Sequence, residues 1–142
     1  FRSGQVLDVE MEGKALNLEQ IDYIHKNKTG ALIEASMMIG AILAGASDTK
    51  ILKIQKIALN IGMAFQIIDD ILDVEGDSSI IGKPVGSDEK NNKTTYVTLR
   101  GIENASEDAK KLSDEALEIL ESFEEKNDFL IELIKLLLNR KK

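Results

Sequence analysis

The chain has 142 residues, a length suited to one domain, and 43% of them are hydrophobic, which is enough to build a core. Its 25 acidic and 18 basic residues give a net charge of −7, which argues against nucleic acid or an anionic membrane surface as a partner. The absence of cysteine excludes disulfides and cysteine metal sites, and the lack of a signal pattern or an apolar run long enough to span a bilayer predicts a soluble cytoplasmic protein.

The hydrophobic periodicity predicts an all-α chain, since one proline and few alternating runs leave little room for a sheet. Residues 1–11 have the pattern of a helix that is already under way, so we expect the chain to be part of a longer protein. Asn17, with Gln20 three residues later, has the capping-box pattern of a short helix that runs to about Lys26. Residues 28–46 are apolar nearly all round, which predicts a central buried helix.

A long helix is expected next, capped by Ser47 or Asp48 and running to about Val74. Its apolar residues recur at intervals of three and four along one face: Ile51, Ile54, Ala58, Ile61, Phe65, Ile68 and Leu72. Residues 75–93 are polar, with three glycines and the only proline, and are predicted to form a long loop. Further helices are expected at residues 94–100, 106–123 and 127–139, followed by a basic tail.

The C-terminal end of the long helix is strongly acidic. No basic residue occurs between Lys56 and Lys83, while five carboxylates fall within nine residues: Asp69, Asp70, Asp73, Glu75 and Asp77. Negative charge at a helix C-terminus is disfavoured by about 0.3–1 kcal/mol per group, and no lysine or arginine three or four residues away offsets this cost. The pattern therefore suggests that a cation is supplied from outside the chain.

On a helical wheel, Gln66, Asp69 and Asp73 share one narrow face at the edge of the apolar stripe, whereas Asp70 lies further round. Gly62 is on the same face, so another group could approach the backbone there. Carboxylates without histidine or cysteine favour a hard ion such as Mg²⁺, and a lysine-bearing loop nearby would suit a phosphorylated substrate. The alternative is a solvated acidic face beside ordinary surface lysines.

Four segments carry a more specific signal. They are GQVLDVE at residues 4–10, HKNKTGALI at 25–33, FQIIDDILD at 65–73 and GDSSIIGKPVGSDEKNNKTTY at 76–96. In type and order they resemble motifs of the short-chain trans-polyprenyl diphosphate synthases, the family of farnesyl and geranylgeranyl diphosphate synthases. The third segment is similar to the second aspartate-rich motif of that family, and the fourth is similar to the lysine loop that follows it.

The resemblance implies a role for each matching residue. The residues expected to hold Mg²⁺ are Asp69, Asp70 and Asp73. Those expected to bind the substrates, mainly through their diphosphates, are Gln5, Asp8, Lys28, Lys83, Lys93 and Arg140. Those expected to act in catalysis are Lys28, Thr29 and Gln66. The oxygens of Thr29 and Gln66 are expected to stabilise an allylic cation at the reacting end, while Lys28 contacts the diphosphate. No side-chain nucleophile is required, and the only histidine, His25, is expected to be a surface residue.

The resemblance also implies an all-α helical bundle of the isoprenoid-synthase type, usually a homodimer, that condenses isopentenyl diphosphate with an allylic diphosphate. The first aspartate-rich motif and the basic residues of the isopentenyl site, which lie in the N-terminal half of the family, have no counterpart here. Residues 1–142 are therefore interpreted as the C-terminal part of a single polyprenyl synthase domain, inactive alone. The alternatives are a non-catalytic regulatory subunit of a heteromeric synthase and a class I terpene cyclase.

Overall fold

The computed structural model describes residues 2–11, 14–80, 94–125 and 127–138, with the backbone alone at residues 2, 5 and 76–80. Every secondary-structure element in this part of the chain is a helix, so the all-α prediction is confirmed. The elements are α1 (Arg2–Glu10), α2 (Leu18–His25), a π-helical turn η1 (Lys26–Gly30), α3 (Ala31–Leu43), α4 (Asp48–Ile80), α5 (Tyr96–Arg100), α6 (Ile102–Glu121) and α7 (Asp128–Leu138). None of the described helices is long and apolar enough to cross a membrane.

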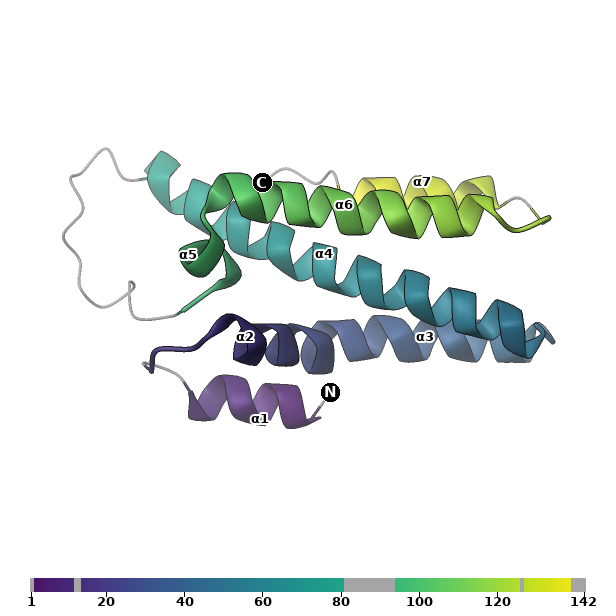
Figure 1. The fold of residues 1–142 in the computed structure, drawn as a ribbon, viewed down its shortest axis with the longest axis horizontal. Helices are drawn as coiled ribbons and strands as arrows, with labels where there is room; N and C mark the ends of the chain where they lie inside the picture. The colour runs from purple at the N-terminus through teal and green to yellow at the C-terminus, as the bar shows by residue number, and fades with distance from the viewer. Residues whose placement is uncertain (1, 12–13, 81–93, 126, 139–142) are drawn as a thin grey trace.

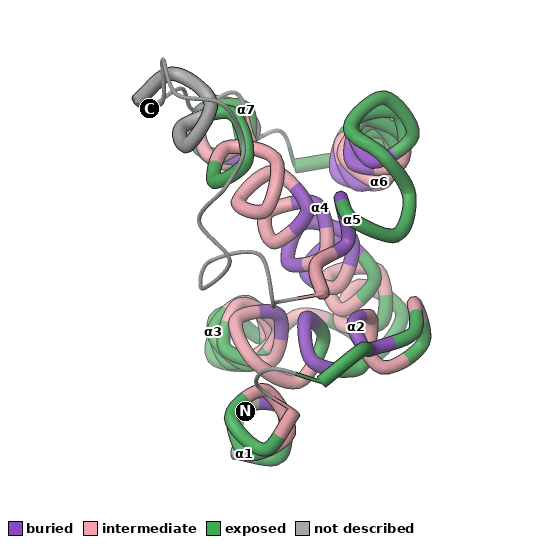
Figure 2. The backbone as a smooth tube through the Cα atoms, turned by 90° about the vertical axis from the view of Figure 1, so that its left-hand side faces the viewer, coloured by how far each residue is buried: buried purple, intermediate pink, exposed green. Residues whose placement is uncertain are grey.

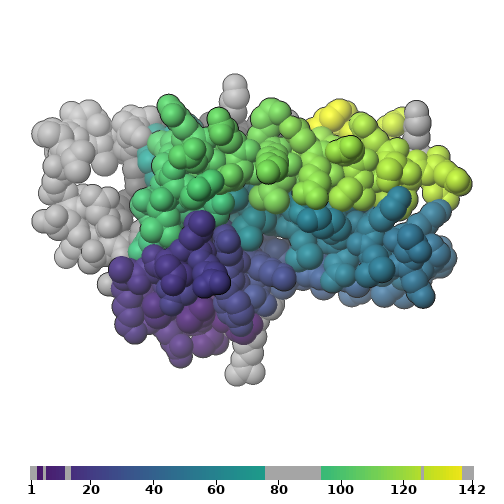
Figure 3. Space-filling model, viewed as in Figure 1, coloured from purple at the N-terminus to yellow at the C-terminus, as the bar shows by residue number. Residues whose placement is uncertain are grey.

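Helix α4 runs through the middle of the molecule (Figure 1). Helices α6 and α7 lie on one side of α4, the α2–η1–α3 segment lies on the other, and α1 lies beneath that segment, as the end-on view in Figure 2 shows. In Figure 3 only a band of α4 is visible between α6 and the layer below it. Because α4 is central, residues near its C-terminal end are surrounded by α2 on one side and by α5 and α6 on the other.

Two clusters of buried side chains form the core on either side of the middle of α4. The cluster nearer the C-terminal end of α4 joins α2, α4, α5 and α6, and consists of Leu16, Ile21, Ile24, Ala64, Ile67, Tyr96, Val97, Ala105 and Ala109. The other joins α4, α6 and α7, and consists of Ile57, Ile61, Ala116, Leu120 and Ile134. The first cluster therefore fixes α2 and α5 against the acidic end of α4.

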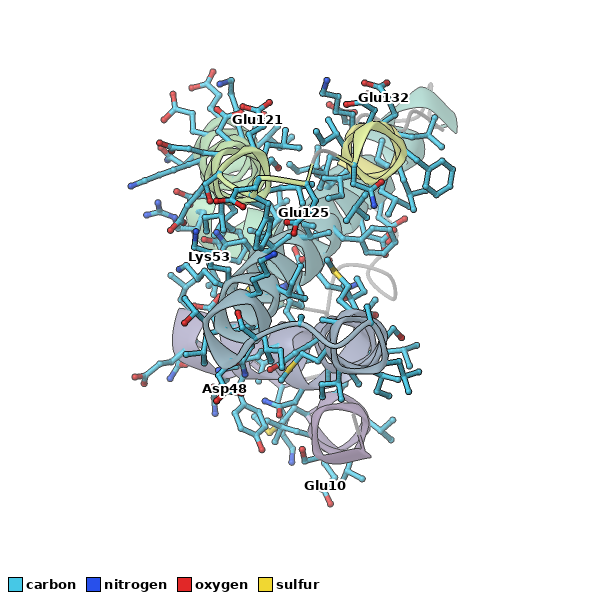
Figure 4. All side chains as sticks on the ribbon, turned by 90° about the vertical axis from the view of Figure 1, so that its right-hand side faces the viewer. Glu10, Asp48, Lys53, Glu121, Glu125 and Glu132 are labelled. Carbon is cyan, nitrogen blue, oxygen red and sulfur yellow. The ribbon has the colours of Figure 1, made fainter. Side chains whose placement is uncertain are left out.

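The opposite end of the bundle, where α4 begins, carries charged side chains on its surface (Figure 4). Lys50 Nζ lies 2.6 Å from Glu125 Oε1, and Lys53 Nζ lies over the Phe123 ring, 5.4 Å from its centroid. These groups are solvated, so their pairing contributes little to stability.

The local signals at helix starts are confirmed. Asn17 caps α2, its side chain accepts a hydrogen bond from the Gln20 backbone N–H, and the Gln20 side chain accepts one from the Asn17 N–H. The Ser47 hydroxyl accepts a hydrogen bond from the Lys50 N–H at the start of α4, which identifies Ser47 as the cap. These contacts depend only on residues close in sequence, which is why the sequence predicts them well.

The structure differs from the predicted helix boundaries most clearly at three places. α2 and α3 are not separate helices, because η1 joins them into one continuous helical run. α4 continues to Ile80, six residues beyond Val74, so the first part of the predicted loop is helical. α6 begins at Ile102, four residues earlier than expected. The rest of the predicted loop, with Lys83 and Lys93, lies outside the described residues, as does Arg140.

The buried face of α4 is broader than the predicted stripe. Ile57, Ala64 and Ile67 are fully buried although they lie outside that stripe, while Phe65, within it, is only half-buried. The reason is that α4 packs against two layers at once, so apolar contacts extend over more of its circumference than one amphipathic stripe provides.

The prediction that α3 is a central buried helix is wrong for this chain. No residue of α3 is fully buried, and Leu32, Ile39 and Leu43 are 58%, 57% and 82% exposed. α3 packs against α4 along one side, and within the part of the chain that the structure describes its other side has no neighbouring helix. An all-round apolar helix indicates burial in a complete protein, and these 142 residues bury only one of its sides.

Candidate active site

Close contacts at glycines bring three elements together at the acidic end of the bundle. A Cβ atom on Gly4 of α1 would lie 2.8 Å from the Lys28 backbone nitrogen, and one on Gly62 of α4 would lie 2.7 Å from Gly30 Cα. Since side-chain carbons do not approach backbone atoms so closely, α1, η1 and α4 can pack at this distance only with glycine at these positions. The close approach to Gly62 that the sequence predicted is made by Gly30 of this chain.

One turn beyond each of these two glycines lies a predicted site residue. Asp8 follows Gly4 by four residues and Gln66 follows Gly62 by four, so each lies on the same helix face as its glycine. Lys28 Nζ is 2.7 Å from Asp8 Oδ2, in an ion pair whose side chains are 30% and 12% exposed respectively. The glycine contacts thus position Lys28 between α1 and α4.

A cavity of about 120 Å³ lies where these elements meet. It is lined by Asp8, Leu16, Ile21, Ile24, His25, Lys28, Gln66, Asp69, Asp70, Asp73, Thr94 and Thr95. Four of these residues are carboxylates, and Lys28 is the one lysine among them. The cavity therefore has an excess of negative charge, as the sequence predicted for this end of the helix.

The structure brings together six of the predicted site residues at the cavity: Asp8, Lys28, Gln66, Asp69, Asp70 and Asp73. Thr29 is half-buried in η1 beside Lys28 but does not line the cavity. Gln5 belongs to α1, and its side chain is outside the described part of the chain. Asp70 was expected to point away from Asp69 and Asp73, and it lines the same cavity because α2 and α5 enclose that side of α4.

The prediction that His25 is a surface residue is wrong. Its side chain is 8% exposed, and its Nε2 atom lies 3.5 Å from Asp70 Oδ2. His25 precedes Lys28 by three residues, so in a continuous helix both lie on one face. The signal was present in the sequence, but placing a helix boundary between them concealed it. Thr94 and Thr95 were missed as well, because nothing local shows that the segment after residue 93 returns to the cavity.

The oxygen donors that line the cavity from α4 suit Mg²⁺ in kind. They come from Gln66, Asp69, Asp70 and Asp73. Among the described residues, no three carboxylate or imidazole groups are placed to hold one ion together. Since Mg²⁺ is usually held by one or two carboxylates together with water and phosphate oxygens, this donor set fits part of a magnesium shell rather than a closed cage.

Tyr96, the first residue of α5, links the cavity wall to α6. Its hydroxyl donates a hydrogen bond to Asp108 Oδ2 at 3.1 Å, and Asp108 also accepts hydrogen bonds from Arg100. Burial, reinforced by the hydrogen bond to the Asp108 carboxylate, raises the pKa of Tyr96 to about 12. Burial also raises the pKa of the nearby Asp22 carboxyl, with Asp108 adding to the shift.

The raised pKa of Tyr96 gives a testable pH dependence. Because folding favours the protonated phenol, its stabilisation is complete below about pH 10 and is lost as the pH rises through about 12. In an alkaline spectrophotometric titration, Tyr96→Phe should remove the tyrosinate signal that develops near pH 12. Retention of that signal in the variant would contradict the assignment.

The amino-acid sequence is similar to that of known prenyl diphosphate synthases. A family model described as polyprenyl synthetase matches residues 1–136. The farnesyl diphosphate synthase of Geobacillus stearothermophilus is 47% identical over 105 residues, which are 74% of this chain and 35% of that protein.

Two solved structures show the same arrangement of helices. Geranylgeranyl pyrophosphate synthetase from Pyrococcus horikoshii Ot3 superposes with a TM-score of 0.82 at 28% identity, over 99% of this chain and 55% of that one. The geranyltransferase from Helicobacter pylori, complexed with magnesium and isoprenyl diphosphate, gives 0.73 at 35% identity, over 97% of this chain and 45% of that one. The chain thus spans between 35% and 55% of the length of these three proteins.

Proposed function

The chain belongs to the polyprenyl synthetase family, and from this premise we propose that the full-length protein is a prenyltransferase that condenses isopentenyl diphosphate with an allylic diphosphate. The observation that carries the proposal is the convergence of Lys28 with Gln66, Asp69 and Asp73 at one cavity. In this reaction the C–O bond of the allylic diphosphate breaks, the double bond of isopentenyl diphosphate attacks the resulting cation, and the departing diphosphate takes the final proton.

Magnesium is the proposed cofactor. Asp69 and Asp73 are the proposed ligands that the geometry favours, because they share the Gln66 face of α4. When bound, Mg²⁺ would supply positive charge that stabilises the departing diphosphate. The complex of the Helicobacter pylori relative with magnesium and isoprenyl diphosphate supports this choice.

Residues of η1, α1 and α4 would act on the substrate itself. Lys28 would bind the allylic diphosphate by a charge-assisted hydrogen bond, and its 2.7 Å contact with Asp8 holds the ammonium group at the cavity beforehand. The amide oxygen of Gln66, which lines the cavity, would stabilise positive charge on the allyl group, and Thr29 remains a predicted contact to that group. Gln5, Lys83, Lys93 and Arg140 remain predicted substrate contacts, and a homodimer remains the predicted assembly.

A non-catalytic regulatory subunit is the competing proposal. Such a subunit has no need of a lysine held by a carboxylate at the wall of an acidic cavity, and the Lys28–Asp8 pair therefore favours the enzyme. A class I terpene cyclase would share the acidic metal motif. The family match over residues 1–136 favours the synthase over the cyclase.

The expected result with the 142-residue chain alone is no chain elongation, because the chain spans 35% of the Geobacillus relative and 45% of the Helicobacter structure and carries one aspartate-rich motif. The measurement is incorporation of labelled isopentenyl diphosphate into an allylic diphosphate in the presence of Mg²⁺. Co-expression with the N-terminal half should restore turnover. Magnesium-dependent product above background from the chain alone would show that our assignment of the site is wrong.

A further inference from the structure

Asp70 makes close contacts within the protein at a point where α2, α4 and α5 meet. Its Oδ2 atom accepts a hydrogen bond from the Tyr96 backbone N–H at 3.0 Å, and His25 Nε2 lies 3.5 Å from the same oxygen. The side chain of Asp70 is 18% exposed and that of His25 is 8% exposed, so water screens these contacts only weakly. This oxygen is therefore already engaged by two groups of the protein.

Tyr96 is fixed from three different helices. Its backbone N–H donates to Asp70 of α4, its ring stacks on His25 of α2 with the centroids 6.4 Å apart and the planes at 25°, and its hydroxyl donates to Asp108 of α6. Each contact restrains a different part of the residue. Loss of the Asp70 carboxylate would release the backbone of Tyr96 and leave the ring and hydroxyl contacts in place.

The position of Tyr96 determines the position of one wall of the cavity. The two residues before it, Thr94 and Thr95, both line the cavity. Thr94 Oγ1 accepts a hydrogen bond from the Leu16 backbone N–H at 3.1 Å, which holds this wall to the start of the α2 layer. The hydrogen bond from Tyr96 to Asp70 holds it to α4. The threonine wall is thus tied both to the α2 layer and to the acidic helix.

We infer that Asp70 is a positioning residue. With His25 beside its carboxylate, it anchors Tyr96 and thereby the threonine wall of the cavity, rather than coordinating a metal ion. The inference concerns the proposed prenyltransferase site and rests on that function for its kinetic consequence. The anchoring itself does not require any activity.

The kinetic test compares Asp70→Ala and Asp70→Asn with Asp69→Asn in the full-length protein. Asparagine keeps an oxygen that can accept the Tyr96 N–H but lacks the charge that a magnesium ligand supplies. For an anchor, Asp70→Ala should raise the KM for the allylic diphosphate about tenfold, and Asp70→Asn should recover most of that loss. The Mg²⁺ concentration for half-maximal rate should rise about tenfold or more in Asp69→Asn and less than about twofold in Asp70→Asn.

A second measurement needs no activity. Hydrogen exchange of the Tyr96 amide should be about tenfold faster in Asp70→Ala than in the wild type, and close to wild type in Asp70→Asn. If Tyr96 exchange differs among the variants in this way but the wild-type protein shows no prenyl transfer, the proposed function fails and the anchoring role of Asp70 stands. If Asp70→Asn raises the magnesium requirement as much as Asp69→Asn, or if Tyr96 exchange is the same in all variants, the inference is overturned.

Discussion

Replacing Asp69 by alanine in the full-length protein should lower kcat/KM for prenyl transfer by about 10²–10⁴, since the loss of one metal-bridged contact to a developing diphosphate is worth several kcal/mol. Asp69 lies at the cavity on the face of α4 that also carries Gln66 and Asp73. Its carboxylate is a proposed ligand of Mg²⁺, so its removal would take away one metal contact. The measurement is steady-state kinetics at saturating Mg²⁺.

The matched control for this prediction is Asp70→Ala. Asp70 follows Asp69 directly, has the same side chain and lines the same cavity. Its Oδ2 atom, however, accepts a hydrogen bond from the Tyr96 N–H and lies 3.5 Å from His25 Nε2. The loss of turnover should therefore be clearly smaller in Asp70→Ala than in Asp69→Ala. Wild-type activity in Asp69→Ala would remove this site from the proposed mechanism, whatever the control shows.

Gly62→Ala should destabilise the chain by about 1–3 kcal/mol or more, because the added methyl group overpacks a backbone contact. Its Cβ would lie 2.7 Å from Gly30 Cα, and the neighbour is backbone that cannot rotate away. Either η1 moves off α4 or the two helices separate locally. Both changes displace Lys28 from Gln66 and Asp69, so binding of diphosphate at the cavity should also weaken. Urea unfolding of the 142-residue chain measures the change in stability.

Gly40→Ala is the control for the glycine substitution. Gly40 lies within α3, and a Cβ there would meet nothing within 4 Å. Alanine is the better helix former, so this substitution should stabilise the same chain by about 0.5–1 kcal/mol. Equal unfolding free energies for Gly62→Ala and Gly40→Ala would show that the Gly62–Gly30 contact is not as tight as described.

The sequence predicted well those features that depend on local chemistry. The Asn17 capping box and the helical class of the fold both depend on residues within a few positions of one another. The placing of Asp8, Lys28 and Gln66 at one cavity could be expected from the family resemblance. The helical wheel alone gave only the shared face of Gln66, Asp69 and Asp73.

Features set by contacts between distant segments were predicted poorly. The buried pair of His25 with Asp70 joins residues 45 positions apart, and the return of Tyr96 to α4 depends on how α5 packs. The exposure of α3 could not be read from its composition, since an apolar helix has the same sequence whether or not its partner belongs to the same 142 residues. In each case the deciding interaction joins segments that are further apart in the sequence than the one or few helical turns over which a hydrophobic pattern can be recognised.

The π-helical turn η1 lets the packing of α2 and α3 and the position of Lys28 be set independently, although all three belong to one helical run. A π-turn accommodates one residue more than an α-turn between the same flanking segments, so it has the effect of a single-residue insertion that the helix absorbs without breaking. α2 and α3 can therefore keep the faces that their packing needs, while Lys28 and Thr29 take a register of their own beside α1 and α4. The continuous helix preserves the packing of α2 and α3, and the extra residue in the π-turn sets the position of Lys28 at the cavity. Selection could in this way alter the position of the lysine by a change in chain length of one residue, without rebuilding the core on either side.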